Sequence, residues 1–254
     1  MTRAATLLFA IVCYAIFFAT FLYLIVFVGD FSFSGRTVDV GPHSDPAVAV
    51  VVDLALIALF GLQHSIMARQ GFKARWTKIV PRPAERSVYV LAASVALMIL
   101  FLGWRPIDTI IWSVSPITQP ATYDVIFALF WVGWLTVLLS TFLINHFELF
   151  GLQQAWLHLR GREAQPPTFR TPFFYKWVRH PLYLGFFLAF WAAPEMTAGH
   201  LLLAVGVSIY MLIAIRYEER DLVGYFGKDY EDYRDRVGML TPRFRRRRPE
   251  RPVG

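Results

Sequence analysis

Long apolar segments are the feature that most restricts the fold of this chain. Four of them, residues 4–28, 47–68, 87–104 and 123–145, approach or exceed the length that a membrane-spanning helix needs, which is about 20 apolar residues. Charged residues make up 17% of the chain, whereas a soluble domain carries about 25%. We therefore predict a single all-α domain over residues 1–254, a polytopic integral membrane helical bundle.

A fifth apolar region, residues 181–215, is interrupted at residues 194–200. Its two arms are short, so we predict a helical hairpin that either crosses as two thin spans or stops short of the far surface. The polar and aromatic residues 216–240 follow as a cytoplasmic helical segment, with a turn at 226–228 because glycine interrupts helical patterns. Residues 241–254 form a basic tail suited to anionic lipid headgroups.

The basic residues are concentrated in alternate loops. There are six in residues 69–86, five in 146–180 and eleven in 216–254, against one each in 29–46 and 105–122. Basic loops stay preferentially on the cytoplasmic side. This pattern predicts a multi-pass protein of a bacterial inner membrane with both termini in the cytoplasm. The first apolar segment is too long and too aromatic for a cleaved signal peptide, so we expect it to be retained.

Several classes of function are disfavoured by the composition. The net charge of +7 lies in the membrane-flanking loops and the tail, so we expect no nucleic-acid partner. Cys13 is the only cysteine, which excludes a disulfide framework and a thiolate metal cluster, and we predict no metal ligands. The glycine-rich fingerprint of a Rossmann-type dinucleotide-binding fold is missing from the sequence.

Polar residues gather at the predicted inner ends of the apolar segments. They form four clusters: Gln63 and His64; Asn145, His146 and Glu148; Arg179, His180 and Tyr183; and Arg216, Glu218 and Glu219. Ionisable groups near a membrane span are costly and usually face a cavity or a partner. Each cluster has an ordinary structural explanation, such as an interfacial histidine, a helix start at Pro181 or an exposed ion-pair lattice. Their convergence on one face favours a shared small-molecule pocket.

Two composite motifs resemble those of known membrane methyltransferases. The run from Arg179 to Gly185, the hairpin, Arg216-Tyr217-Glu218-Glu219 and the run from Phe226 to Tyr230 are similar to the relatives of isoprenylcysteine carboxyl methyltransferase, over about residues 175–240. Residues 61–65 and 145–152 look like the methanethiol S-methyltransferases, which make dimethyl sulfide from methanethiol and S-adenosylmethionine. Similar helices also occur in denitrification-associated membrane proteins.

The resemblance implies that the chain binds S-adenosylmethionine, which residues 216–240 cap, and releases S-adenosylhomocysteine. The cofactor-binding residues that it implies are Arg179, His180, Pro181, Tyr183, Gly185, Arg216, Glu218 and Glu219. Free amide groups and the dipole at the start of a helix beginning at Pro181 favour a carboxylate, and an arginine can bind the same group bidentately. The implied partners are a small thiol and membrane lipids, with no obligatory protein partner.

Methyl transfer to a thiol requires the thiolate. His64 and His146 are the candidate catalytic bases because histidine titrates near neutrality, and Glu148 or Asn145 is suited to fixing the tautomer of His146. The sequence alone does not choose between the two histidines. Three other functions stay open: methylation of a lipid or prenylated cysteine, a haem or quinone carrier using both histidines, and a non-catalytic membrane scaffold.

Overall fold

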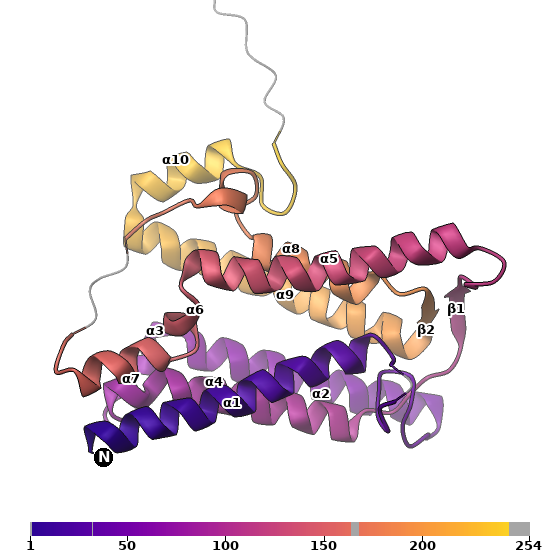
Figure 1. Ribbon diagram of the computed structural model, residues 1–254, viewed down its shortest axis with the longest axis horizontal. Coiled ribbons are helices and arrows are strands. Elements are labelled where there is room, and N and C mark those ends of the chain that lie inside the picture. Colours follow the sequence, from indigo (N-terminus) through magenta and orange to yellow (C-terminus); the bar gives the residue numbers. More distant parts are fainter. Residues whose placement is uncertain (1, 32, 164–167, 244–254) are drawn as a thin grey trace, which may run out of the picture.

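The computed structural model describes residues 2–31, 33–163 and 168–243 (Figure 1). The predicted basic tail falls outside the described residues from position 244 onward.

Five helices among the described residues are long and apolar enough to cross a membrane. They are α1 (Arg3–Val28), α2 (Pro46–Ala68), α4 (Arg82–Gly103), α5 (Pro120–Ile144) and α9 (Ala198–Phe226). At 1.5 Å per residue even the shortest reaches about 33 Å, and the hydrocarbon core is about 30 Å thick. The predicted polytopic helical bundle is confirmed, and the chain is a multi-pass membrane protein.

Prolines and capping side chains set the starts of the long helices. Thr2 accepts a hydrogen bond from the amide of Ala5 at 3.2 Å, and Asp45 accepts one from Ala47 at 2.9 Å. Prolines occupy the first turn of α2, α4 and α5, where a missing N–H costs nothing. Helix α4 begins at Arg82, whereas the sequence predicted a start at residue 87. The difference arises because the first turn of α4 is polar, so hydropathy does not detect it although it is helical.

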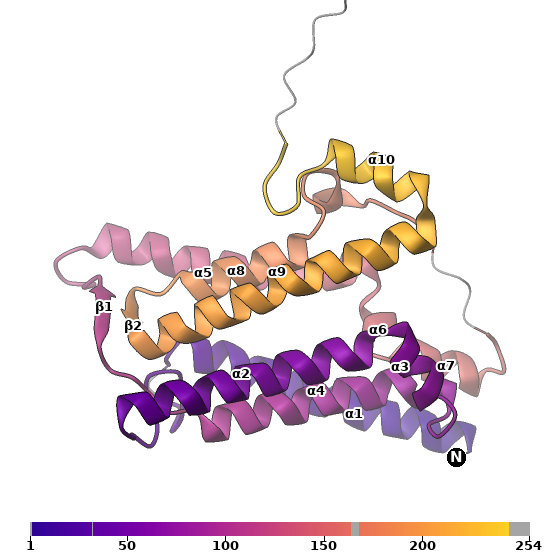
Figure 2. The same ribbon diagram turned by 180° about the vertical axis from the view of Figure 1, so that it is seen from behind.

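The long helices form two layers (Figures 1 and 2). One layer holds α1, α2 and α4, and the other holds α5, α9 and the short helix α8 (Pro181–Trp191), with α2 and α9 in contact between the layers. An aromatic core joins them, in which the buried rings of Phe27, Phe101 and Trp104 pack beside those of Phe130 and Trp134.

The predicted hairpin over residues 181–215 has unequal arms. Helix α8 covers only about 16 Å, whereas α9 has 29 residues and covers about 43 Å. The prediction of two short arms was wrong for the second arm, because the helix continues through Arg216 and ends at Phe226 rather than where the apolar residues end. Gly227, with a φ of 55°, separates α9 from α10 (Lys228–Arg236), which confirms the predicted turn.

A small β-ribbon, which the sequence analysis did not predict, closes the turn between α8 and α9. Strand β1 (Ile110–Ser113) pairs antiparallel with β2 (Glu195–Thr197). The indole of Trp112 also donates to the carbonyl of Ala193 at 3.0 Å. These contacts satisfy backbone groups of a segment that is not helical between the two apolar helices.

Helices α5 and α8 approach at a pair of glycines. A Cβ built at Gly133 would lie 2.6 Å from the amide nitrogen of Ala189, and one at Gly185 would lie 2.7 Å from the carbonyl oxygen of Gly133. Only glycine fits at both positions without moving a backbone, as is usual where membrane helices pack closely.

The loops and short helices separate to opposite ends of the bundle (Figures 1 and 2). One end carries the start of α1, the ends of α2, α5 and α9, and the short helices α3 (Gln70–Trp76), α6 (His146–Leu149) and α7 (Leu152–Leu159). We call it the basic end, because residues 69–86 and the loop after α5 lie there. The ribbon of β1 and β2 lies at the other end.

Candidate active site

All four predicted polar clusters lie at the basic end of the bundle. His64 stands four residues before the end of α2, and His146 is the first residue of α6, separated from α5 by Asn145. Arg179 and His180 precede α8, while Glu218 and Glu219 lie in the last turns of α9. The contacts of these residues divide them into three groups.

The first group is a buried ion pair between Arg179 and Glu219, and His180 binds the same carboxylate. Nε of Arg179 donates to Oε1 of Glu219 at 2.7 Å, and Nε2 of His180 lies 3.0 Å from the same oxygen. The Arg179 side chain is 8% exposed and that of Glu219 is 14% exposed. Arg179 also donates to the carbonyl groups of Arg234, at 3.0 Å, and Val237. A buried charge needs such partners to offset its lost hydration.

Arg179 and His180 also bind the C-terminal segment through their backbone amides. The amides of Arg179 and His180 donate to the carbonyl groups of Gly238 and Met239 at 2.9 and 3.1 Å. Residues 228–239, which we call the cap, are thereby held against the start of α8. Arg179 consequently uses its side chain and its backbone to hold the cap in place.

Aromatic rings pack beneath the cap. Phe169 contacts the rings of Phe226, Tyr230 and Tyr233 with centroids 5.4 to 5.9 Å apart, and the hydroxyl of Tyr233 donates to the carbonyl of Tyr175 at 2.5 Å. Burial raises the pKa of Tyr233 to about 12 and raises that of Tyr230 further. The hydroxyl of Tyr230 is covered and has no hydrogen-bond partner within the described part of the chain.

The second group joins α8 to α9. The hydroxyl of Tyr183 donates to Oε2 of Glu218 at 3.0 Å, and this glutamate is exposed. Arg216 is also exposed, and no ion pair with it is found among residues 2–31, 33–163 and 168–243. Pro181 is the first residue of α8 and is buried.

The second group also includes His64, through tyrosines of neighbouring helices. Nε2 of His64 lies 2.7 Å from the hydroxyl oxygen of Tyr89 on α4. The imidazole stacks on Phe60 at 5.3 Å and meets the ring of Tyr210 edge-on at 6.3 Å. Its Nδ1 is covered and has no hydrogen-bond partner among the residues that the structure describes. One nitrogen of His64 is therefore held, and the other is covered without a hydrogen-bond partner among the described residues.

His146 belongs to a third group, with both of its nitrogens engaged. The Thr141 hydroxyl donates to the carbonyl of Leu138 at 2.7 Å and so accepts from Nδ1 of His146 at 2.9 Å. Nε2 is then the acceptor for the hydroxyl of Tyr14, at 2.8 Å. Burial lowers the pKa of His146, which agrees with a neutral ring in this arrangement.

The partners expected for His146 are different in the structure. Glu148 is exposed and accepts from the amide side chain of Asn145 at 2.9 Å, and the Asn145 side chain caps the short helix α6. Neither residue fixes the tautomer of His146, because Thr141 and Tyr14 do.

Gly185 lies against α5, as described above, so the role that the structure gives it is helix packing. Its contact with a cofactor stays a prediction. Three residues important for these groups, Tyr14, Tyr89 and Thr141, were not identified from the sequence. A tyrosine or threonine within an apolar segment is common and carries no spacing signal of its own.

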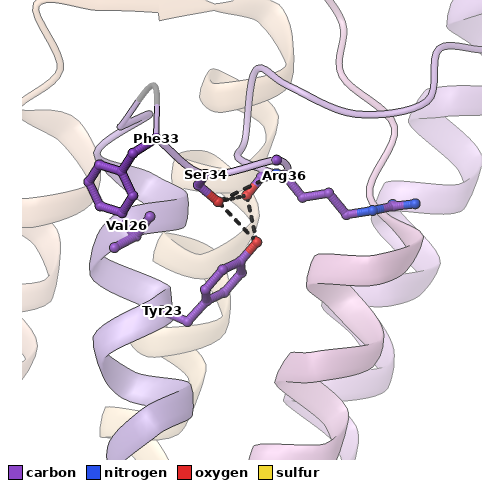
Figure 3. Close-up of a pocket in the computed structure, with 6 residues that line it drawn as sticks. Tyr23, Val26, Phe33, Ser34 and Arg36 are labelled. Carbon is purple, nitrogen blue, oxygen red and sulfur yellow. Dashed lines mark hydrogen bonds between the residues drawn. The ribbon is translucent and has the colours of Figure 1, made fainter.

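Two cavities lie away from these groups. One of about 520 Å³ is lined by Tyr23, Val26 and the loop from Phe33 to Arg36, where the Tyr23 hydroxyl donates to the carbonyl of Arg36 (Figure 3). The other, of about 610 Å³, is apolar and lies between α5, α8 and β1. The first lies near the end of α1, far along the bundle from the basic end.

Comparison with known proteins assigns the chain to a family. The NnrU protein family matches residues 54–242. This chain belongs to the NnrU protein family. The match begins within α2 and ends just after the cap, so His64, Tyr89 and the Arg179–Glu219 pair lie inside it, while Tyr14 lies outside.

Named relatives of this NnrU family member match from two thirds to nearly all of its length. Methanethiol S-methyltransferase 2 of Bradyrhizobium diazoefficiens is 50% identical, covering 99% of this chain and 98% of that protein. Methanethiol S-methyltransferase of Mycobacterium tuberculosis is 51% identical, covering 95% and 98%. Nurim of Rattus norvegicus is 30% identical over 67% of this chain and 66% of its own. The resemblance to the methanethiol S-methyltransferases is confirmed. No solved structure matches this chain.

Proposed function

We propose that this protein transfers a methyl group from S-adenosylmethionine to methanethiol, releasing dimethyl sulfide and S-adenosylhomocysteine. The observation that carries the proposal is the identity of about 50%, along nearly the whole chain, to proteins named methanethiol S-methyltransferase. A methyltransferase needs a methyl donor, and the motifs at the basic end resemble those that bind S-adenosylmethionine.

The residues around the cap suit that donor. The amides of Leu182 and Tyr183 precede the first intrahelical bond of α8, which the amide of Leu184 donates at 3.0 Å, so they are suited to a carboxylate. Glu218 supplies an exposed carboxylate for an amine or ribose hydroxyls. The hydroxyl of Tyr230, a cap residue, has no hydrogen-bond partner among the described residues and is a further polar group for the donor.

Three further residues have indirect or additional roles in this proposal. Arg179 and His180 act through Glu219, since both side chains bind its carboxylate, and the Arg179 side chain also holds the cap. Arg216, exposed on α9, is a candidate for a second contact with the donor carboxylate. S-adenosylmethionine supplies, when bound, a methyl group on a positively charged sulfur that a thiolate can accept.

We assign the role of general base to His64. Its Nδ1 has no hydrogen-bond partner in the part of the chain that the structure describes and can take the thiol proton, whereas both nitrogens of His146 are already hydrogen-bonded. The aromatic rings of Phe60, Tyr89 and Tyr210 around His64 suit a small apolar thiol. Charge disperses as a thiolate meets a cationic donor, so a dry apolar site favours the reaction.

We also propose that the basic end faces the cytoplasm of a bacterial cell, with both termini on that side. The alternating basic loops support this orientation, and the cytosolic supply of S-adenosylmethionine requires it.

Binding and activity of histidine variants test the assignment. Purified protein should bind S-adenosylmethionine and S-adenosylhomocysteine in calorimetry, and Glu219→Ala should weaken both. His64→Ala should lower thiol methylation by about 10²–10⁴-fold, the usual cost of losing a general base, with little change in donor binding. His146→Ala should lower thermal stability more than turnover. The opposite result for the two histidines would overturn the choice of base.

A further inference from the structure

Two hydrogen-bonded tyrosine–histidine pairs in this protein have nearly equal oxygen-to-nitrogen distances, but the second nitrogen of the histidine has a partner in only one of them. The Tyr89–His64 pair is 2.7 Å long and the Tyr14–His146 pair is 2.8 Å long. His146 also uses its second nitrogen, on Thr141, whereas Nδ1 of His64 is covered and lacks a partner among the described residues. A buried polar atom without a partner is costly and therefore calls for an explanation.

Tyr89 is itself firmly held. Its side chain is buried, with 6% exposed, and the guanidinium of Arg86 lies 4.9 Å from its ring centroid. Arg86 is in turn anchored by a 2.7 Å hydrogen bond from its Nε to the carbonyl of Leu149. The hydroxyl of Tyr89 therefore gives His64 a fixed partner on a different helix.

We propose that Tyr89 is a positioning residue that holds His64 with Nε2–H toward the Tyr89 oxygen and Nδ1 toward the thiol. This inference rests on the proposed thiol methylation. In the step concerned, the S–H bond of methanethiol breaks, its electron pair stays on sulfur, and the proton forms a new bond to Nδ1 of His64. The ring then carries two N–H groups and a positive charge, and the Tyr89 oxygen accepts from Nε2–H.

The contact is stronger once the ring is charged, because charge-assisted hydrogen bonds exceed neutral ones. Tyr89 therefore stabilises the state after proton transfer more than the state before it, which is the requirement for a faster step. A phenylalanine at position 89 would keep the ring contacts with His64 and Arg86 but lose this acceptor.

The test compares two thiols of different acidity in wild-type protein and in Tyr89→Phe. We expect Tyr89→Phe to lower kcat with methanethiol by about 10–100-fold, as when the outer partner of a functional histidine is removed. S-adenosylmethionine binding should stay unchanged. With 2,2,2-trifluoroethanethiol, which ionises more readily, the loss should be several-fold smaller, because less of the reaction depends on the base.

The matched control is Tyr14→Phe, which removes a hydrogen bond of similar length, donated by Tyr14 to the histidine that has a second partner. It should lower kcat with both thiols equally, by less than about twofold, while losing stability. The ratio of the two thiol rates within one preparation does not depend on the folded fraction. A poorly folding variant therefore still gives an answer.

The outcomes separate failure of the role of Tyr89 from failure of the proposed function. An equal loss of kcat with both thiols in Tyr89→Phe, or no loss, overturns the role of Tyr89 while wild-type activity upholds the proposed function. Wild-type protein that methylates neither thiol overturns the proposed function, and with it this inference.

Discussion

Arg179 and Glu219 form a buried ion pair across the start of α8 and the end of α9, with Nε and Oε1 2.7 Å apart. The guanidinium continues to two carbonyl groups of the cap, so one side chain connects both helices to the C-terminal segment. The motifs that resemble those of S-adenosylmethionine-dependent membrane enzymes thus supply an ion pair that holds the C-terminal segment to α8 and α9. Under the proposed function, the donor-binding surface depends on this ion pair.

Removal of this arginine should therefore release the cap. Arg179→Ala leaves Glu219 buried without its main partner, and breaking a buried pair in this way costs about 3–5 kcal/mol. We expect a lower thermal midpoint in detergent and donor binding weaker by at least about tenfold, which corresponds to about 1.4 kcal/mol.

Arg220→Ala is the matched control, since Arg220 is exposed on the same helix one residue beyond Glu219. Its unfolding midpoint and donor affinity should match the wild-type values. Equal behaviour of the two arginine variants would show that the buried pair does not hold the cap.

The close approach of α5 and α8 leads to the next prediction, in which two glycine-to-alanine substitutions have opposite effects on stability. Gly133→Ala places a methyl group 2.6 Å from the amide nitrogen of Ala189, and overpacking of this kind costs about 1–3 kcal/mol or more. Gly224→Ala on α9 meets nothing within 4 Å and should stabilise the helix by up to about 1 kcal/mol. Thermal unfolding in detergent measures both, and a tolerated Gly133→Ala would contradict the packing described.

A third prediction concerns Asp39, which lies in the loop between α1 and α2. Burial raises the pKa of Asp39 to about 7, the neighbouring carboxylates of Asp30, Glu195 and Asp108 add to this, and the Thr197 hydroxyl opposes it. An unfolded aspartate has a pKa of about 3.9, so the folded protein binds the extra proton between about pH 4 and 7. The stability that this proton contributes is lost as the pH rises through that window.

Asp39→Asn should remove that dependence. The unfolding midpoint of the variant should exceed the wild-type value at pH 8, and the difference should shrink toward pH 5. Asp124→Asn, at an exposed position on α5, is the control and should leave the wild-type pH dependence in place. A wild-type midpoint that does not change between pH 5 and 8 would contradict the raised pKa.

Reporter fusions test the proposed orientation. Reporters placed after residues 40 and 115 should lie outside the cytoplasm, and those placed after residues 77, 165 and 254 should lie inside. The reason is that the basic loops share one end of the bundle with the start of α1. A reporter after residue 254 that is found outside would separate the site from the cytosolic donor.

Hydropathy was sufficient to predict the four long helices and the end of the bundle at which the polar clusters lie. It failed where helical structure and apolar character end at different residues. Helix α4 starts with a charged turn at Arg82, and α9 continues past Arg216 to Gly227. Backbone hydrogen bonds, which hydropathy does not measure, set these boundaries.

The partners within the site could not be predicted, because they depend on how each helix is rotated about its axis. Tyr89 follows His64 by 25 residues, and Tyr14 precedes His146 by 132. Close contacts such as that between Gly133 and Gly185 fix those rotations. The sequence therefore identified both histidines as candidates, and only the structure distinguished their hydrogen-bonding.

Identification of the methylated product tests the central proposal most directly. Purified protein would be incubated with methyl-labelled S-adenosylmethionine and, in parallel, methanethiol, a prenylated cysteine, a phospholipid amine or no acceptor. The proposal predicts labelled dimethyl sulfide with methanethiol, formed in equal amount to S-adenosylhomocysteine, and a loss of that product in His64→Ala. Label in the prenylated cysteine or the phospholipid instead, or no transfer by a protein that binds the donor, would contradict it.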